Sequence, residues 1–238
     1  MSSEGPTSQW VGEYSAFVAM GYARVMSRLM KASVDGIVFR LGLSGGRTPI
    51  DIYRLLANPM PEPATWSNAD LFFADERDAP PTEPESNYWE VRKVLVEPAG
   101  IPPARVHRMK ADSQDLEAAA AEYDELLEEP LDLLVLGLGE DGHVASLFPG
   151  SRWLEERERR VVPVYDSPKL PPRRLTITPR VIHEAREVLV LASGREKAKA
   201  LAAALAPTGE VSRTPARLVR NRSWLMDYAA AAELPSPS

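Results

Sequence analysis

The sequence predicts an α/β fold in which a doubly wound, mostly parallel sheet is covered by helices on both faces. Apolar runs with strand character alternate along the chain with segments of helical periodicity, which is the pattern of successive βαβ units. The clearest runs are 131–138 (LDLLVLGL) and 187–192 (EVLVLA). Neither shows the alternation of apolar and polar residues that is typical of a strand with one solvent-exposed face, so we expect strands that are buried on both sides.

The amino-terminal half opens with apolar side chains near helical spacing over 8–32, which predicts an amphipathic helix. We expect the first strand over 36–43. A helix follows from Thr48 to about Ala57, with the threonine as its cap and Pro49 in its first turn. The further elements expected in this half are a strand over 69–74, a polar loop over 75–86, and helices over 87–96 and 112–129.

The carboxyl-terminal half continues the alternation of strands and helices. The expected elements are strands over 131–138, 161–165, 175–177 and 187–192, a loop over 166–174, and helices over 179–185 and from 196 to about 206. Neither a repeat nor a linker divides the chain. We therefore expect one domain over 1–238, with its core at about 10–228 and a disordered tail over 230–238.

Composition narrows the function classes. The chain contains no cysteine, which removes disulfides, thiolate metal sites and cysteine nucleophiles. A net charge of −6 argues against nucleic-acid partners, and no apolar run approaches a membrane span of about 18 residues. The amino terminus lacks the pattern of a signal peptide, so we expect a cytoplasmic protein. Arginines outnumber lysines 22 to 6, which suits capture of anions but also fits a genome composition bias.

A glycine-rich turn, GLSGGRTP (42–49), links the first predicted strand to its helix. Gly45 and Gly46 would let the backbone approach a ligand, and the helix start offers unpaired N–H groups to an anion. Ser44 and Thr48 add hydroxyls. The turn also matches the nucleophile-elbow pattern G-x-S-x-G with Ser44 as nucleophile, and a plain tight turn is the remaining alternative.

Asp141-Gly-His143 follows the strand over 131–138, at the sheet edge where open α/β sheets bind ligands. Histidine is suited to acid–base chemistry near neutral pH, and Asp141 could hold the imidazole in one tautomer. A structural turn histidine is the alternative. The same stretch formally contains G-x-G-x-x-G (137–142). Pro149 comes too soon for the long helix of a dinucleotide site, so we do not expect NAD.

Two further clusters carry charge. Asp75, Glu76 and Arg77 follow the strand over 69–74 and could orient hydroxyls and clamp a phosphate, or form a surface ion pair. The proline-stiffened loop DSPKLPPRR contains Lys169, Arg173 and Arg174, which bind an anion or simply face solvent. No spacing typical of metal ligands is found, so no metal is expected.

The motifs, taken in chain order, resemble those of the 6-phosphogluconolactonase family over roughly residues 10–228. The segments concerned are SGGRTP, FFADER, ESNYWEVRKVL, LLVLGLGEDGHVASLFPGS, DSPKLPPRRLTIT and VLVLASGREKAKAL. That family is similar to the glucosamine-6-phosphate deaminases, and the resemblance implies a Rossmann-like fold related to ribose-5-phosphate isomerase. The deaminases carry a glutamate where this chain has Phe148 and a tyrosine where it has Arg77, and both departures favour the lactonase.

The resemblance implies hydrolysis of 6-phosphoglucono-1,5-lactone, the second step of the oxidative pentose phosphate pathway, with no covalent intermediate and no cofactor. His143, assisted by Asp141, would activate water. The N–H groups of Gly45 and Gly46, or a nearby cation, would stabilise the oxyanion. The phosphate candidates are Arg77, Lys169 and Arg173, with Arg77 preferred, while Ser44, Thr48 and Asp75 would contact hydroxyls or loop backbone.

Three alternatives stay open at this point. A deaminase or isomerase on the same fold would release ammonia from glucosamine 6-phosphate. A serine esterase would use Ser44 as its nucleophile. A non-catalytic sugar-phosphate sensor would bind 6-phosphogluconate without needing His143. The expected partner in the lactonase interpretation is the small sugar-phosphate lactone, and the protein is expected to be a monomer or a homodimer.

Overall fold

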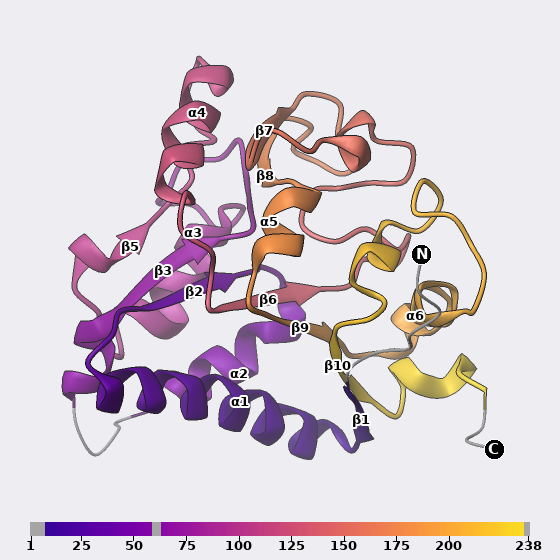
Figure 1. The fold of residues 1–238 in the computed structure, drawn as a ribbon, viewed down its shortest axis with the longest axis horizontal. Helices are drawn as coiled ribbons and strands as arrows, with labels where there is room; N and C mark the ends of the chain where they lie inside the picture. The colour runs from indigo at the N-terminus through magenta and orange to yellow at the C-terminus, as the bar shows by residue number, and fades with distance from the viewer. Residues whose placement is uncertain (1–7, 59–62, 236–238) are drawn as a thin grey trace.

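The computed structural model describes residues 8–58 and 63–235, and a seven-stranded sheet forms its centre (Figure 1). All six strand pairings in this sheet are parallel. In spatial order the strands are β1 (Ser8–Gly12), β10 (Ser223–Asp227), β9 (Glu187–Ala192), β6 (Leu133–Gly137), β2 (Phe39–Leu43), β3 (Ala69–Phe73) and β5 (Val106–His107). The chain winds outward from β2 in one direction and from β6 in the other. The reversal leaves a crevice at the carboxyl ends of these two central strands.

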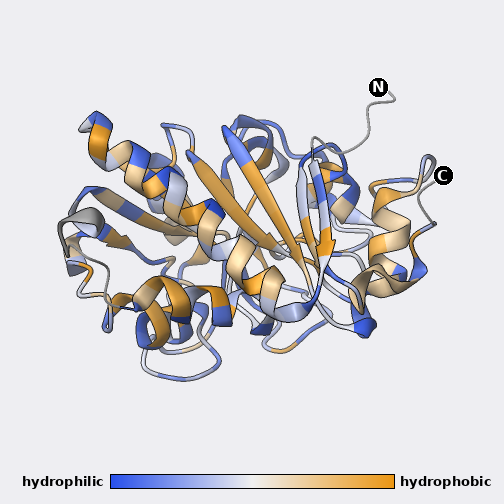
Figure 2. Ribbon diagram, turned by 90° about the horizontal axis from the view of Figure 1, so that it is seen from below, coloured by the Kyte–Doolittle hydropathy of each residue, from blue (hydrophilic) through white to orange (hydrophobic). Residues whose placement is uncertain are grey.

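Helices cover both faces of the sheet. Figure 1 shows α1 (Tyr14–Asp35) and α2 (Arg47–Ala57) on one side, and α5 (Pro179–Glu184) on the other. The remaining α-helices are α3 (Asn87–Val91), which continues as a π-helix over Arg92–Val96, α4 (Leu116–Leu126) and α6 (Ala198–Leu205). In Figure 2 the strands form a continuous hydrophobic band between these helices. The prediction of a doubly wound parallel sheet is therefore confirmed.

The first helix is shorter than its apolar pattern predicted. Ser8–Gly12 form β1, which pairs with β10 in parallel register, and α1 begins only after Glu13, whose backbone is extended. The predicted helix over 8–32 is therefore wrong for 8–12, where sheet hydrogen bonds to a distant strand replace helical ones. Within α1, Phe17 and Leu29 are fully buried, and each such side chain contributes about 1.5–3 kcal/mol of hydrophobic stabilisation. Gly36, at φ 68°, ends the helix.

A second, antiparallel sheet was not predicted. It consists of β4 (Asp75–Arg77), β8 (Arg174–Ile177) and β7 (Val161–Val164), with β8 in the middle. β4 begins directly after β3, so the predicted loop over 75–86 is wrong at its start. Asp75 pairs with Thr176 and Arg77 with Arg174. The small sheet thus brings two charged segments, about 100 residues apart, to the same sheet edge as the crevice.

The carboxyl-terminal segment also departs from expectation. Ala230–Glu233 form a 3-10 helix, and the buried Ala230 donates its N–H to Asp227 Oδ1 at 2.7 Å. The expected disorder is therefore wrong for these residues, because Asp227 binds the start of the turn. Residues 236–238 of the predicted tail lie outside the described residues. Among the helices that the structure describes, none is both long and apolar enough to cross a membrane.

Candidate active site

A cleft of about 320 Å³ lies at the crevice between β2 and β6. The glycine turn after β2 forms one wall, and the segment after β6 that carries His143 forms another. The small antiparallel sheet and its loop close the third side. The lining residues that matter below are Ser44, Gly45, Gly46, Arg47, Thr48, Asp75, Arg77, Asn87, Gly139, His143, Lys169, Leu170, Arg174 and Lys197.

The glycine turn is built from side-chain and backbone contacts to its neighbours. Ser44 Oγ donates to the carbonyl of Val135 at 3.0 Å, which ties the end of β2 to β6. Ser44 is 5% exposed and its hydroxyl bonds a carbonyl rather than an imidazole, so the contact does not support a serine nucleophile. Gly46, at φ 89°, occupies the position before α2, so the predicted threonine cap is wrong and Thr48 lies inside the first turn. The Gly46 N–H donates to Glu90 Oε2 at 3.0 Å.

Gly45 has to be glycine because of its neighbour Asn87. A Cβ at Gly45 would lie 2.1 Å from Asn87 Oδ1, well inside van der Waals contact. Asn87 cannot move away freely, because its Nδ2 donates to the Asp75 carbonyl at 2.9 Å and to Asp75 Oδ1 at 3.1 Å. Both Asp75 atoms are acceptors, so the amide orientation is fixed. The turn therefore depends on α3 for its shape.

His143 is positioned by two glycines and one carboxylate. The Gly139 N–H donates to the His143 carbonyl at 2.9 Å, and Gly142 turns the chain at φ 83°. The imidazole Nδ1 lies 2.5 Å from Asp141 Oδ1. It packs over Gly139, where a Cβ would lie 2.0 Å from Nδ1. The imidazole also contacts Phe148, with ring centroids 4.6 Å apart.

The protonation state of Asp141 determines the tautomer of this imidazole. Burial alone would raise the pKa of Asp141, but the hydrogen bond and charge of His143, with the ammonium of Lys169, hold that pKa well below its usual range. Asp141 is therefore a carboxylate at neutral pH and only accepts hydrogen bonds. The Nδ1 atom must then carry the proton. In the neutral ring, Nε2 is left with its lone pair as a base.

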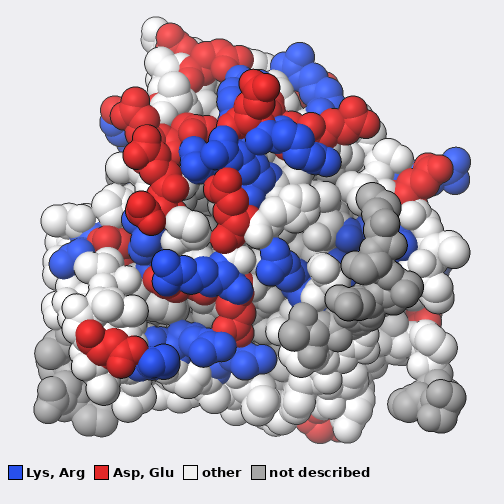
Figure 3. Space-filling view, in the orientation of Figure 1, with Lys and Arg blue, Asp and Glu red and all other residues white. Residues whose placement is uncertain are grey.

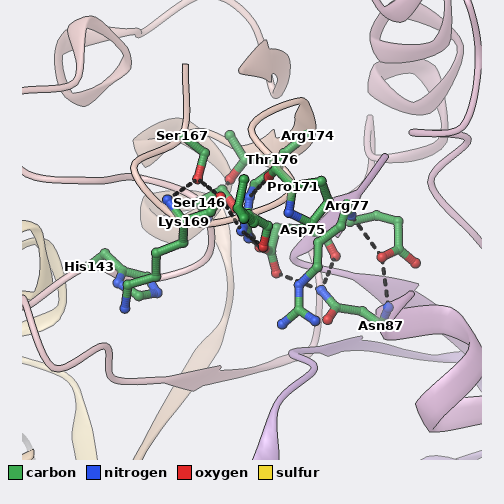
Figure 4. Close-up of polar contacts among 12 residues, drawn as sticks. Asp75, Arg77, Asn87, His143, Ser146, Ser167, Lys169, Pro171, Arg174 and Thr176 are labelled. Carbon is green, nitrogen blue, oxygen red and sulfur yellow. Dashed lines mark hydrogen bonds and ion pairs between the residues drawn. The ribbon is translucent and has the colours of Figure 1, made fainter. Parts of the chain in front are cut away.

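Cationic side chains surround the cleft. The predicted Arg77 and Lys169 both line it, and Lys169 Nζ lies 3.7 Å from Asp141 Oδ1. Arg77 donates from Nη1 to the Glu85 carbonyl at 3.0 Å, while its buried Nε has no hydrogen-bond acceptor among the residues that the structure describes. Figure 4 shows His143 and Lys169 on one side of the group, and Arg77 with Asn87 on the other. On the face shown in Figure 3, by contrast, basic and acidic side chains are interspersed.

The predicted Arg173 does not line the cleft, and its neighbour Arg174 does. The Nη2 atom of Arg173 lies 3.3 Å from the carbonyls of Ser113 and Gln114, and its Nε lies 3.6 Å from Asp78. Adjacent residues along extended backbone point to opposite sides, so only one of the two arginines can face the site. The prediction that Arg173 belongs to the site is therefore wrong, and Arg174 is the arginine of this pair that lines the cleft.

Arg47 and Lys197 are cleft residues that the sequence reasoning missed. Lys197 follows the second glycine turn, at Gly194 after β9, and its side chain is only 14% exposed. Its Nζ lies 3.7 Å from Glu140 Oε1. A glycine turn with a nearby lysine at the carboxyl end of a predicted strand was the available signal. Arg47 is exposed at the rim, immediately before Thr48.

Asp75 is held by residues of the protein itself. Its Oδ2 accepts from Ser146 Oγ at 2.6 Å and lies 3.9 Å from Arg174 Nη1, while Oδ1 accepts from Asn87 (Figure 4). Ser146 follows Ala145, which has a φ of 50°, a left-handed conformation that is uncommon for a residue with a Cβ. The carboxylate thus links α3, the segment after β6 and strand β8, which all border the cleft. This network favours a positioning role for Asp75.

A larger cavity of about 580 Å³ lies beyond Phe148, lined mainly by prolines and aromatic residues, and it lacks the converging cations of the cleft. Over 8–58 and 63–235, no group of three His, Asp or Glu side chains is placed to hold a metal ion. The chemistry available in the cleft is therefore that of an oriented imidazole base beside several cations.

Comparison with known proteins agrees with the motif resemblance. Residues 13–226 match the family model described as glucosamine-6-phosphate isomerases/6-phosphogluconolactonase. The 6-phosphogluconolactonase of Streptomyces coelicolor is 38% identical over 232 residues, covering 90% of this chain and 88% of its own length. The human 6-phosphogluconolactonase is 37% identical over 217 residues, covering 84% and 82% respectively.

Solved structures agree as well. The 6-phosphogluconolactonase from Trypanosoma brucei superposes with a TM-score of 0.84 at 27% identity, covering 98% of this chain and all of that one. A monomeric glucosamine-6-phosphate deaminase superposes with a TM-score of 0.83 at 21% identity, which shows a shared fold. On the extent of the family match and the identity to its members, the chain belongs to the glucosamine-6-phosphate isomerase/6-phosphogluconolactonase family.

Proposed function

We propose that this protein hydrolyses 6-phosphoglucono-1,5-lactone to 6-phosphogluconate, with His143 as the general base. The observation that carries the proposal is the His143–Asp141 pair, set at 2.5 Å on one wall of a cation-lined cleft. The named lactonases among the relatives give the substrate class. A lactone ester needs an activated water, and an anionic sugar needs cations.

In this mechanism water lies between His143 Nε2 and the lactone carbonyl carbon C1. Nε2 takes a proton as the water oxygen bonds to C1, and the carbonyl oxygen becomes an oxyanion. When that oxyanion collapses, the bond from C1 to the ring oxygen breaks, and the imidazolium returns its proton to the ring oxygen. The new carboxylic acid then loses its proton to solvent. Asp141 stabilises the imidazolium, and a positioned base of this kind contributes about 10²–10⁴-fold.

The cations divide between the two ends of the substrate. Lys169, beside Asp141, is on the same side as the base and is suited to stabilise the oxyanion. Arg77, on the opposite side, lines the cleft with the first residues of α2 and is our candidate for the 6-phosphate. The Gly46 N–H is already bound to Glu90, so it is a weaker candidate for the oxyanion than Lys169. Ser44 and Asp75 act by shaping the walls, and Thr48 is available to substrate hydroxyls.

The structure argues against the deaminase alternative at one position. Phe148, where the deaminases carry a glutamate, is 4% exposed and packs against the imidazole of His143. An apolar ring in that place offers no acid for opening a sugar ring. The shared fold with a deaminase at 21% identity does not bear on the reaction.

We further propose that the protein is a single domain acting in the cytoplasm, as a monomer or homodimer, and without nucleic-acid partners. The absence of cysteine fits a reducing compartment, and the net charge of −6 argues against nucleic-acid partners. The proposed small-molecule partner is the phosphorylated lactone alone.

The direct test is hydrolysis of lactone generated in situ, followed as acid release and corrected for spontaneous opening. His143→Gln should lower kcat by about 10²–10⁴-fold and leave binding of 6-phosphogluconate nearly unchanged. His183→Gln is the matched control, because His183 lies on α5 and does not line the cleft. Near-wild-type kcat in His143→Gln would remove His143 from its role. Ammonia release from glucosamine 6-phosphate would instead identify a deaminase.

A further inference from the structure

The segment between β7 and β8 crosses one side of the cleft, and we call residues 167–172 the strap. Lys169 and Leu170 of the strap both line the cleft, although Leu170 is 87% exposed. The strap is closed on itself by the Ser167 N–H, which donates to the Pro172 carbonyl at 3.0 Å. Ser167 Oγ also donates to the Lys169 carbonyl at 2.9 Å.

One guanidinium binds three successive carbonyls of this strap. Nη2 of Arg174 donates to the carbonyls of Lys169 at 3.0 Å and Leu170 at 3.1 Å, and Nε donates to that of Pro171 at 3.1 Å. The remaining nitrogen, Nη1, lies 3.4 Å from Ser146 Oγ (Figure 4). Arg174 is only 5% exposed, so these contacts are made away from water, where each matters more.

The strap also places the ammonium group of Lys169 near the proposed base. Lys169 Nζ lies 3.7 Å from Asp141 Oδ1, and the same oxygen holds His143 Nδ1. The guanidinium of Arg174 also lies over the ring of Phe148, 5.6 Å from its centroid, and that ring contacts the imidazole of His143. Arg174 therefore affects the base mainly by fixing the position of Lys169.

We infer that Arg174 is a positioning residue: it holds the strap so that Lys169 stays beside Asp141 and the reacting carbonyl. Only a planar fork with several donors can satisfy three carbonyls at once, and lysine, as a point charge, cannot replace it. The expected effect of Arg174 on the rate rests on the proposed lactone hydrolysis, whereas its effect on the conformation of the strap does not. The inference assigns Arg174 a role distinct from binding the phosphate.

The kinetic test is a double-mutant cycle between Arg174→Lys and Lys169→Ala. Arg174→Lys alone should lower kcat/KM by about 10²-fold, the usual loss when a catalytic group is misplaced by about 1 Å. If Arg174 acts through Lys169, the double variant should be no slower than Lys169→Ala. Losses that multiply in the double variant would overturn the inference, because Arg174 would then act on the substrate by itself.

The adjacent arginine provides a matched control. Arg173→Lys makes the same chemical change one residue away, at a side chain that contacts the Ser113 and Gln114 carbonyls, and it should leave kcat/KM unchanged. Should Arg174→Lys fold poorly in thermal unfolding, Ser167→Ala loosens the strap while leaving Arg174 in place. Its smaller loss of activity should likewise disappear in the Lys169→Ala background, and a loss that persists there would overturn the inference.

Limited trypsin digestion tests the strap without any substrate. The bond after Lys169 precedes the exposed Leu170, so its cleavage rate, read by mass spectrometry, reports how firmly the strap is held. Arg174→Lys should accelerate this cleavage, and Arg173→Lys should not. Equal rates in Arg174→Lys and the wild-type protein would overturn the inference. If the wild-type protein hydrolysed no lactone but the strap still loosened, the proposed function alone would fail.

Discussion

An alanine at Gly139 should disable the proposed base without replacing any titratable group. A Cβ there would lie 2.0 Å from Nδ1 and 2.2 Å from Cε1 of His143, and 2.7 Å from Asp141 Oδ1. All three separations are far inside van der Waals contact. The φ of Gly139 lies outside the left-handed region, so the backbone itself accepts alanine. The imidazole must therefore turn away from Asp141.

The size of the effect follows from what the base contributes. A positioned general base supplies about 10²–10⁴-fold, which is about 2.7–5.4 kcal/mol of barrier at 1.36 kcal/mol for each tenfold change. If Gly139→Ala removes His143 from the attacking water, kcat should fall by an amount in this range. KM should change little, because Arg77 lies on the opposite side of the cleft.

The assay is the initial rate of hydrolysis of fresh lactone, corrected for spontaneous opening, with thermal unfolding as the check on folding. Gly139→Ala combined with His143→Gln should be no slower than His143→Gln alone, since both changes remove the same group. A folded Gly139→Ala variant with wild-type kcat would refute the reasoning. So would a double variant much slower than either single one.

Three further predictions concern the carboxylate, the glycine turn and the phosphate candidate. Asp141→Asn should lower the free energy of unfolding at pH 7, and the difference should begin to shrink as pH falls below about 4 and disappear only as pH falls through the lower folded-state pKa. The reason is that the folded-state pKa of Asp141 is held below its unfolded value; urea titrations that show a constant difference down to pH 3 would contradict this sign. Gly45→Ala should cost about 1–3 kcal/mol in urea unfolding, because its Cβ would meet Asn87 Oδ1 at 2.1 Å, and unchanged stability would contradict the clash. Arg77→Ala should raise KM for the lactone by about ten- to a hundredfold, the loss of a hydrogen bond to a charged group, and an unchanged KM would place the phosphate elsewhere.

The central sheet was predictable because its strands carry a local signal. β9 spans the predicted residues 187–192, and β6 lies within 131–138, since a strand buried on both faces must be apolar throughout. The strands that escaped prediction are β1, β4 and β5, which are edge strands or very short ones, and β10, an interior strand between β1 and β9. Their existence depends on partners far away in the sequence, such as Thr176 for Asp75, which no local window contains.

Part of the candidate site was predictable for the same reason. Residues at the ends of strong strands, such as His143 and Gly45, could be placed, because parallel strands deliver their carboxyl ends to one edge. The choice between Arg173 and Arg174 could not be made, since it depends on which side of β8 faces the cleft. That orientation is set by the pairing of β8 with β4 and β7, and nothing local distinguishes two adjacent arginines.

The pairing of β1 with β10 has a consequence for biosynthesis. Ser8 leaves the ribosome 215 residues ahead of Ser223, its partner in the sheet. The first strand must therefore wait, unpaired, while the interior of the protein assembles around β2, β3, β6 and β9. Contacts between such distant segments form late because the intervening loop must close first. Pairing of β1 with β10 is thus expected to follow the assembly of these strands.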